Sequence, residues 1–223
     1  MHRITALILA YLGLAVGWQC PRVSAQAAAA LVLEVHGTIQ PGVAPYQEVA
    51  AETQFTLADD ARLVFLHYST CRMVTVVGGS ITLNTETYTM IGGAKKVERR
   101  VDCPRQVVLQ AEGSSAGILI RGAPMVPVLR LSTQPTFVLV GRRADDFAAV
   151  QVTTQDGVIV LKAPLQGRRF RWPTGVAPLS ANTAYKLTLL PALEKAAALT
   201  ASFVATAPAV SRRDSALLLV RVE

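Results

Sequence analysis

Short runs of apolar residues alternate with polar ones along most of the chain, and glycine, proline or aspartate separates one run from the next. Alternation with a period of two places successive side chains on opposite faces of an extended strand, so the pattern predicts β-strands. In the first predicted strand, residues 31–36, Leu31, Leu33 and Val35 share one face, which indicates a strand buried on one side. Residues 63–68 carry large apolar side chains on both faces, which predicts a strand buried on both sides.

Three pairs of turn-forming residues divide the central stretch, residues 56–103. Asp59-Asp60 predicts a turn because aspartate side chains hydrogen-bond to the nearby backbone. Gly78-Gly79 and Gly92-Gly93 predict hairpin turns because glycine accepts the positive φ that such turns require. Further strands are predicted at 97–102, 106–111 and 117–121. Short strands at this regular spacing indicate an all-β sandwich or roll.

The pattern stops at residues 123–127, where two prolines in a short segment predict a linker, and then restarts. Strands are predicted at 128–132, 136–141, 147–153, 158–162, 168–172, 183–190, 199–206 and 215–222. Gln155-Asp156-Gly157 predicts the hairpin between two of them, and Trp172 is expected in the core. Short strands at this density fit a sandwich of the immunoglobulin type.

Three segments of the first half occur in a recognisable order: residues 35–41 (VHGTIQP), the apolar run 63–66, and the V-x-V-x-G-G-x-I-x-L run at 74–83. In this order they resemble the FecR-type domain of exported bacterial proteins. The resemblance implies a β-domain over residues 30–122 that serves in the periplasm as a sensor or scaffold rather than as an enzyme.

Near the end of the chain, Leu179, Thr183 and Tyr185 form an L-x-x-x-T-x-Y run. This run is similar to one in fibronectin type III domains, where the tyrosine hydroxyl bonds back to the upstream backbone. The resemblance implies a second β-sandwich over residues 126–222. We therefore predict an all-β protein with two β-domains, a FecR-like roll or sandwich and an immunoglobulin-like sandwich, after an N-terminal signal helix.

The first residues predict export. Met1–Arg3 is short and positive, residues 4–18 are apolar, and Val23-Ser24-Ala25 places small or branched residues where a signal peptidase reads. The apolar stretch is shorter than the roughly 20 residues of a membrane span. We expect residues 1–25 to be a signal peptide, with cleavage after Ala27 or a retained anchor helix as alternatives. The mature protein is expected to be periplasmic or secreted, without a membrane span.

The cysteines support this expectation. Cys20 leaves with the signal peptide, so Cys71 and Cys103 remain as an even pair. In an oxidising compartment such a pair predicts a disulfide. The alternative is a periplasmic metal-binding protein, because His67, Cys71 and Met73 are soft ligands suited to copper. The disulfide hypothesis leaves no free Cys71 thiolate, and we expect no metal and no cofactor.

The chain carries a formal net charge of +7. Its basic residues gather in two places, and these are the predicted binding residues: Lys95, Lys96, Arg99 and Arg100 in one cluster, and Arg168, Arg169 and Arg171 in the other. Arginine binds phosphate or carboxylate through two parallel hydrogen bonds, so an envelope protein or an anionic envelope polymer is the expected partner. Charged edge strands that prevent aggregation are the alternative explanation. Without long basic runs, no nucleic-acid partner is expected.

No catalytic constellation stands out, and we predict no catalytic residues. No serine lies in a G-x-S-x-G elbow, and the adjacent acids Asp59-Asp60 and Asp145-Asp146 fit turns better than a catalytic carboxylate pair. Neither glycine pair is followed by the Gly-Lys-Ser/Thr sequence of a phosphate-binding loop. The sequence predicts a non-catalytic binding or scaffold protein of the cell envelope, acting through β-strand edges and basic hairpin faces.

Overall fold

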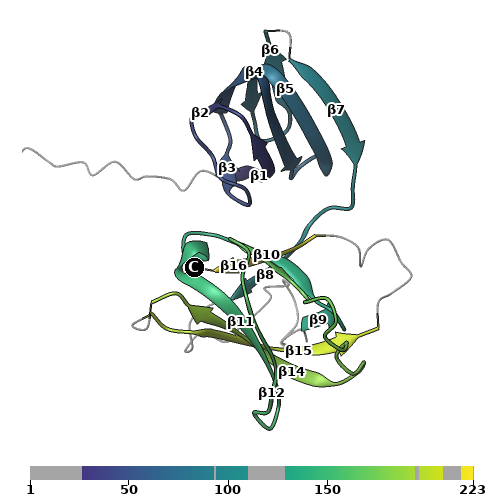
Figure 1. Ribbon diagram of the computed structural model, residues 1–223. Helices are drawn as coiled ribbons and strands as arrows, with labels where there is room; N and C mark the ends of the chain where they lie inside the picture. Colours follow the sequence, from purple (N-terminus) through teal and green to yellow (C-terminus); the bar gives the residue numbers. More distant parts are fainter. Residues whose placement is uncertain (1–26, 93, 110–128, 194–195, 208–216, 223) are drawn as a thin grey trace, which may run out of the picture.

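The computed structural model describes residues 27–92, 94–109, 129–193, 196–207 and 217–222. These residues form β-strands with one short 3-10 helix at Ala144–Asp146, and they confirm the predicted all-β class (Figure 1). The predicted signal peptide, the strand predicted at 117–121 and the linker predicted at 123–127 lie outside them. Within the described ranges, no helix has the length and apolar character that a membrane span requires.

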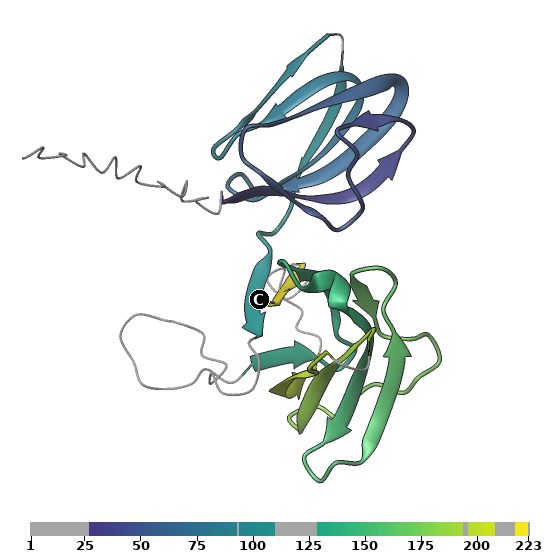
Figure 2. The same cartoon turned by 90° about the vertical axis from the view of Figure 1, so that its left-hand side faces the viewer.

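Seven strands of the described chain form one antiparallel sheet, which we call the N-terminal unit (Figure 1). They are β1 (Ala28–His36), β2 (Ile39–Gln40), β3 (Glu48–Ala50), β4 (Thr53–His67), β5 (Arg72–Leu83), β6 (Tyr88–Ile91) and β7 (Lys95–Arg100). The order is β3-β1-β4-β5-β6, with β2 beside β4 and β7 beside β5. Figure 2 shows this sheet curling around its own interior, where one apolar cluster lies.

Two of the predicted turns are bends inside long strands. Asp59-Asp60 lies within β4 and Gly78-Gly79 within β5, and the chain reverses between these two sites, at residues 68–71. The register between β4 and β5 shifts between Leu57 and Arg62, next to the glycines, whose φ angles are +65° and +71°. A β-bulge and a hairpin turn can both use residues with positive φ, so the glycine pair alone does not distinguish them. For this reason the prediction of a hairpin turn at Gly78-Gly79 was wrong. The bulge lets one long hairpin bend over its own core.

The remaining strands form the C-terminal unit, a sandwich of two sheets. One sheet has the order β13 (Arg169–Arg171), β10 (Thr136–Val140), β16 (Leu218–Val222) and β8 (Arg105–Leu109). The other has the order β12 (Ile159–Pro164), β11 (Phe147–Thr154), β14 (Ala184–Pro191), β15 (Leu199–Thr206) and β9 (Leu129–Ser132). Both contribute to a single core, which includes Trp172 as predicted. The hydroxyl of Tyr185 accepts a hydrogen bond of 3.1 Å from the amide of Ser180, the contact that its sequence run implied.

Strand β8 belongs to the C-terminal unit, although the predicted boundary at residue 122 placed it in the first domain. It pairs in parallel with β16, from Arg105 opposite Leu218 to Leu109 opposite Val222. Its inward side chains Val107 and Leu109 join the core of that unit. The chain therefore crosses from one unit to the other between β7 and β8. Alternation predicted the strand, but it does not identify the strand's partner.

A third apolar cluster lies between the two units. Its buried members are Leu31, Leu66, Val138, Val140 and Leu219, from strands β1, β4, β10 and β16. In β10 the alternate residues, Phe137 and Leu139, face the core of the C-terminal unit instead. Strand β10 is thus buried on both faces, and so is the second half of β4, residues 63–67, as its pattern predicted. We call this cluster and the polar contacts around it the junction.

The burial of β1 differs from the prediction. The sequence pattern predicted a strand buried on one side, but in the first half of β1 both faces are covered. Ala30 and Val32 pack into the core of the N-terminal unit, whereas Leu31 packs into the junction. The first half of β1 is buried on both faces because the second unit covers its outer face, whereas residues 33–36 alternate between half-buried and exposed.

Candidate binding surface

Strand β7 forms an edge of the N-terminal unit. It pairs with β5, and among the described residues no strand pairs with its other side. The predicted binding residues Lys95, Lys96, Arg99 and Arg100 all lie on this one strand, and all are exposed. The structure therefore brings the first basic cluster together on an open strand edge.

The register of β7 sorts these side chains onto two faces. Glu98 lies opposite Val74, and Lys96 opposite Val76, two residues of the core, so these side chains are on the core side of the sheet. The next residues along the strand alternate with them. Lys95, Val97 and Arg99 lie on the outer side, and we call these three residues the outer face of β7.

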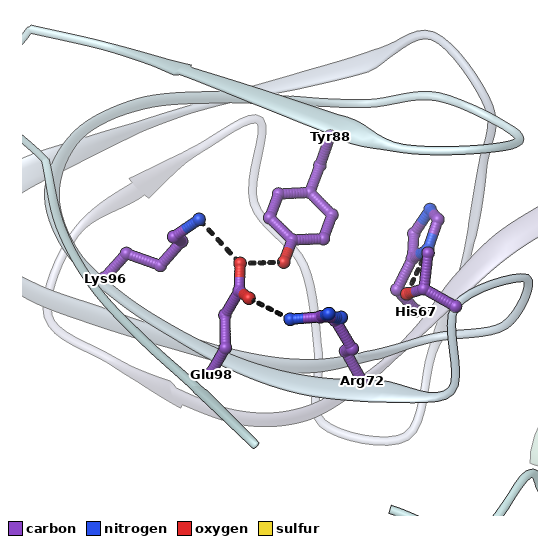
Figure 3. Close-up of polar contacts among 6 residues, drawn as sticks. His67, Arg72, Tyr88, Lys96 and Glu98 are labelled. Carbon is purple, nitrogen blue, oxygen red and sulfur yellow. Dashed lines mark hydrogen bonds and ion pairs between the residues drawn. The ribbon is translucent and has the colours of Figure 1, made fainter. Parts of the chain in front are cut away.

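On the core side, the carboxylate of Glu98 accepts hydrogen bonds from three side chains (Figure 3). Glu98 accepts from Lys96 Nζ at 2.6 Å and from Arg72 Nη1 at 2.5 Å, and the hydroxyl of Tyr88 also donates to it. The Lys96 hydrogen bond, followed by those from Tyr88 and Arg72, lowers the pKa of Glu98 to about 2. Burial and the neighbouring carboxylate raise the pKa of Tyr88, so its phenol remains a donor. This network ties β7 to β5 and β6.

His67, beside this network in Figure 3, has a structural role. Its buried ring packs edge-on against Tyr88, with the ring centroids 5.4 Å apart. Both ring nitrogens have partners at 3.0 Å, the hydroxyl of Thr70 at Nδ1 and the backbone carbonyl of Asn84 at Nε2. The ring is therefore saturated and closed to solvent.

Replacing Glu98 by glutamine is expected to reduce the stability of the protein at pH 6 and to flatten its acid dependence. A carboxyl group whose pKa falls on folding stabilises the fold above its ordinary value and loses this contribution as pH falls. For Glu98, whose pKa falls from 4.5 to about 2, this loss occurs between pH 4.5 and about pH 2. Urea midpoints measured across this window should therefore converge for wild type and Glu98→Gln. Glu86→Gln, in an exposed turn, is the matched control, and a constant offset at every pH would contradict the expectation.

The second predicted basic cluster lies largely in the junction. Arg168 forms an ion pair with Asp145 and lies 3.5 Å from the carbonyl oxygen of Tyr46. Arg169 donates to the Tyr46 hydroxyl at 3.2 Å, with its guanidinium 6.0 Å from the ring centroid. Tyr46 belongs to the N-terminal unit, so these two arginines hold the units together. Only Arg171, which is exposed, remains on an open surface.

A second polar cluster in the junction was not predicted. Glu48 accepts from Arg221 Nη2 at 2.7 Å and from the Tyr68 hydroxyl at 3.0 Å. Burial, and next the carboxylate of Glu48, raise the pKa of Tyr68. These residues are far apart in sequence, and the only local sign was Arg221 within an otherwise apolar strand. The cluster pairs one half-buried carboxylate with a cation between the units.

The soft ligands His67, Cys71 and Met73 are not brought together. Cys71 and Cys103 form the predicted disulfide, so the Cys71 sulfur is not a thiolate ligand. The sulfur of Met73 accepts from Arg99 Nη2 at 3.6 Å. Across the part of the chain that the structure describes, no group of three or more His, Cys, Asp or Glu residues has the arrangement of a metal site. The disulfide instead ties the segment after β7 to the turn before β5.

Comparisons with known proteins add no assignment to this geometry: no family model matches the chain, and no curated protein or solved structure matches it.

Proposed function

We propose that the protein is an exported, non-catalytic binding or scaffold protein of the bacterial cell envelope that binds anionic partners through the β7 edge. The observation that carries this proposal is the group of basic side chains on one open strand edge. Within the described residues, no ion pair joins Lys95 or Arg100 to an acidic side chain, so both charges are available. Arginine and lysine in such a row attract carboxylates and phosphates.

Export and the two domain resemblances complete the proposal. A disulfide between the two cysteines outside the signal segment is typical of proteins in oxidising compartments. The FecR-like assignment applies to the N-terminal unit, and its members are scaffolds or sensors. The immunoglobulin-like or fibronectin-like assignment applies to the C-terminal sandwich, where the contact between Tyr185 and the Ser180 amide supports it.

Reversing two charges on β7 is expected to weaken polyanion binding by at least about tenfold at low salt, because steering and contact both depend on these cations. The variant is Lys95→Glu with Arg100→Glu, and neither of these two residues donates to Glu98. The probes are lipopolysaccharide micelles and poly-L-glutamate, which self-repulsion keeps unstructured at neutral pH. Binding is measured by titration at several salt concentrations.

The matched control is Lys162→Glu with Arg142→Glu, which changes the net charge equally on exposed positions of the C-terminal unit. This control should bind within about twofold of wild type, because its charges lie on the C-terminal unit and not on β7. Equal losses in both variants would show that net charge alone drives binding and would overturn the proposal. Absence of binding by wild type would overturn it as well.

A further inference from the structure

We infer that β7 receives one extended acidic segment of a partner protein, which adds to the sheet of the N-terminal unit as a further strand. The inference rests on the proposed function and gives its partner a chemical form. The segment carries two acidic side chains on one face, with an apolar side chain between them. Three features of β7 lead to this inference: its open backbone, the composition of its outer face, and its rigid support.

The backbone of β7 is the first feature. An edge strand presents unpaired amide and carbonyl groups to its open side. Here the strand runs over six residues, Lys95–Arg100, and within the described residues its pairing is limited to β5. An extended peptide can pair with such an edge through main-chain hydrogen bonds, and its side chains then supply specificity.

The outer face of β7 gives the pattern that a partner strand must match. Val97 has 70% of its surface exposed and lies between Lys95 and Arg99. Side chains directly opposite one another on neighbouring strands lie about 5 Å apart. Each side chain of the outer face therefore favours a complementary side chain at the facing position of the partner strand. An acidic residue therefore fits opposite Lys95 and Arg99, and an apolar residue fits opposite Val97. Protection from aggregation alone would favour a charge, not an exposed valine, at the centre of the edge.

The support beneath β7 is the third feature. Glu98 binds Lys96, Arg72 and Tyr88 on the core side, which fixes the faces of the strand. After the strand, the amide of Val101 donates to the carbonyl oxygen of Cys71 at 3.0 Å, and the disulfide follows at Cys103. An edge held in this way loses little conformational freedom when a partner binds.

A polysaccharide or a phosphate polymer would use only part of this surface. It would be attracted by Lys95 and Arg99, but it has no peptide backbone to complete the sheet and no apolar side chain to cover Val97. An acidic peptide strand uses the charges, the backbone groups and the valine together. The observations therefore favour a protein segment over a polymer.

The test uses the full chain and a seven-residue peptide, acetyl-Thr-Glu-Thr-Val-Thr-Glu-Thr-amide. Its pattern is symmetric, so it matches the outer face in either strand direction. Binding is followed by calorimetry and by amide hydrogen exchange. We expect saturable binding, with amides of β7 exchanging at least about tenfold more slowly in the complex. Lys95→Glu with Arg99→Glu should abolish binding of this peptide, and a peptide with lysine in place of both glutamates should restore it.

The decisive control uses two methylated forms of the same peptide, one methylated on the odd-numbered backbone nitrogens and the other on the even-numbered ones. We call each choice a methylation register. Both forms keep every charge, but in one register the methyl groups replace the amide hydrogens that would bond to β7. Loss of binding in that register supports strand addition, whereas equal binding by both methylated forms overturns it. If poly-L-glutamate binds in a β7-dependent manner while the peptide gives no protection of β7, this inference fails and the proposed function stands. If neither probe binds, both fail.

Discussion

Replacing Leu219 by aspartate is expected to separate the two units while leaving each core intact. Leu219 is buried in the junction with Leu31, Leu66, Val138 and Val140, and it contributes to neither core. A carboxylate there would lie among apolar side chains, and burying a charge in apolar surroundings is costly. The units can avoid this cost by moving apart.

The loss of junction contacts should reduce the free energy of unfolding by about 2–4 kcal/mol, and the separated units should become more accessible to protease. The radius of gyration from X-ray scattering should increase, and trypsin should cleave the crossing segment after Arg100 or Arg105. Fluorescence of Trp172, the one tryptophan outside the predicted signal peptide, should stay native because this residue lies in the core of the C-terminal unit.

Val220→Ala is the matched control, because Val220 is the next residue along β16 and faces the core of the C-terminal unit. It should lower stability by about 1–2 kcal/mol without changing the radius of gyration. An unchanged radius for Leu219→Asp, with the protein still folded, would show that the junction does not hold the units together.

Removing the disulfide has the second large effect. Cys71→Ala with Cys103→Ala should lower the free energy of unfolding by about 3–4 kcal/mol, because the bond restricts the unfolded chain across a sequence separation of 32 residues. Urea unfolding of the double variant measures this loss. Reduced wild-type protein should show the same shift.

The intact mass of the purified protein checks the bond itself. Alkylation should add two groups only after reduction. If the predicted cleavage after Ala25 is correct, the mass should equal that of a chain whose first residue is Gln26. Alkylation of both thiols in folded protein without reductant would contradict the disulfide. Wild type and double variant would then be expected to unfold at the same urea concentration.

Local patterns predicted most of the strands well because alternation with a period of two is strong in this chain. The disulfide was predictable for a different reason: with Cys20 assigned to the predicted signal peptide, one possible pair was left. The bends at Asp59-Asp60 and Gly78-Gly79 were mistaken for turns because turns and bulges use the same residue types. The residue types at a site show that the backbone bends there, but they do not show whether the strand continues beyond the bend.

The junction could not be predicted because it depends on contacts between distant residues. Arg168 and Arg169 resembled a binding patch in the sequence, but Asp145 and Tyr46 occupy them in the fold. The basic residues of β7 were predicted individually, whereas their alignment on an open edge follows from the register with β5. Reversing Arg168, Arg169 and Arg171 together would therefore disturb the junction rather than test binding alone.

The position of β16 has a consequence for the order in which the chain folds. This last described strand lies between β10 and β8 in its sheet, and it also supplies Leu219 and Arg221 to the junction. The sheet and the junction are completed only when Leu218–Val222 have been synthesised, and pairing of such distant segments is slow. For the exported protein that we propose, this arrangement would give the chain time to cross the membrane unfolded. Folding would then be completed in the compartment in which the disulfide forms.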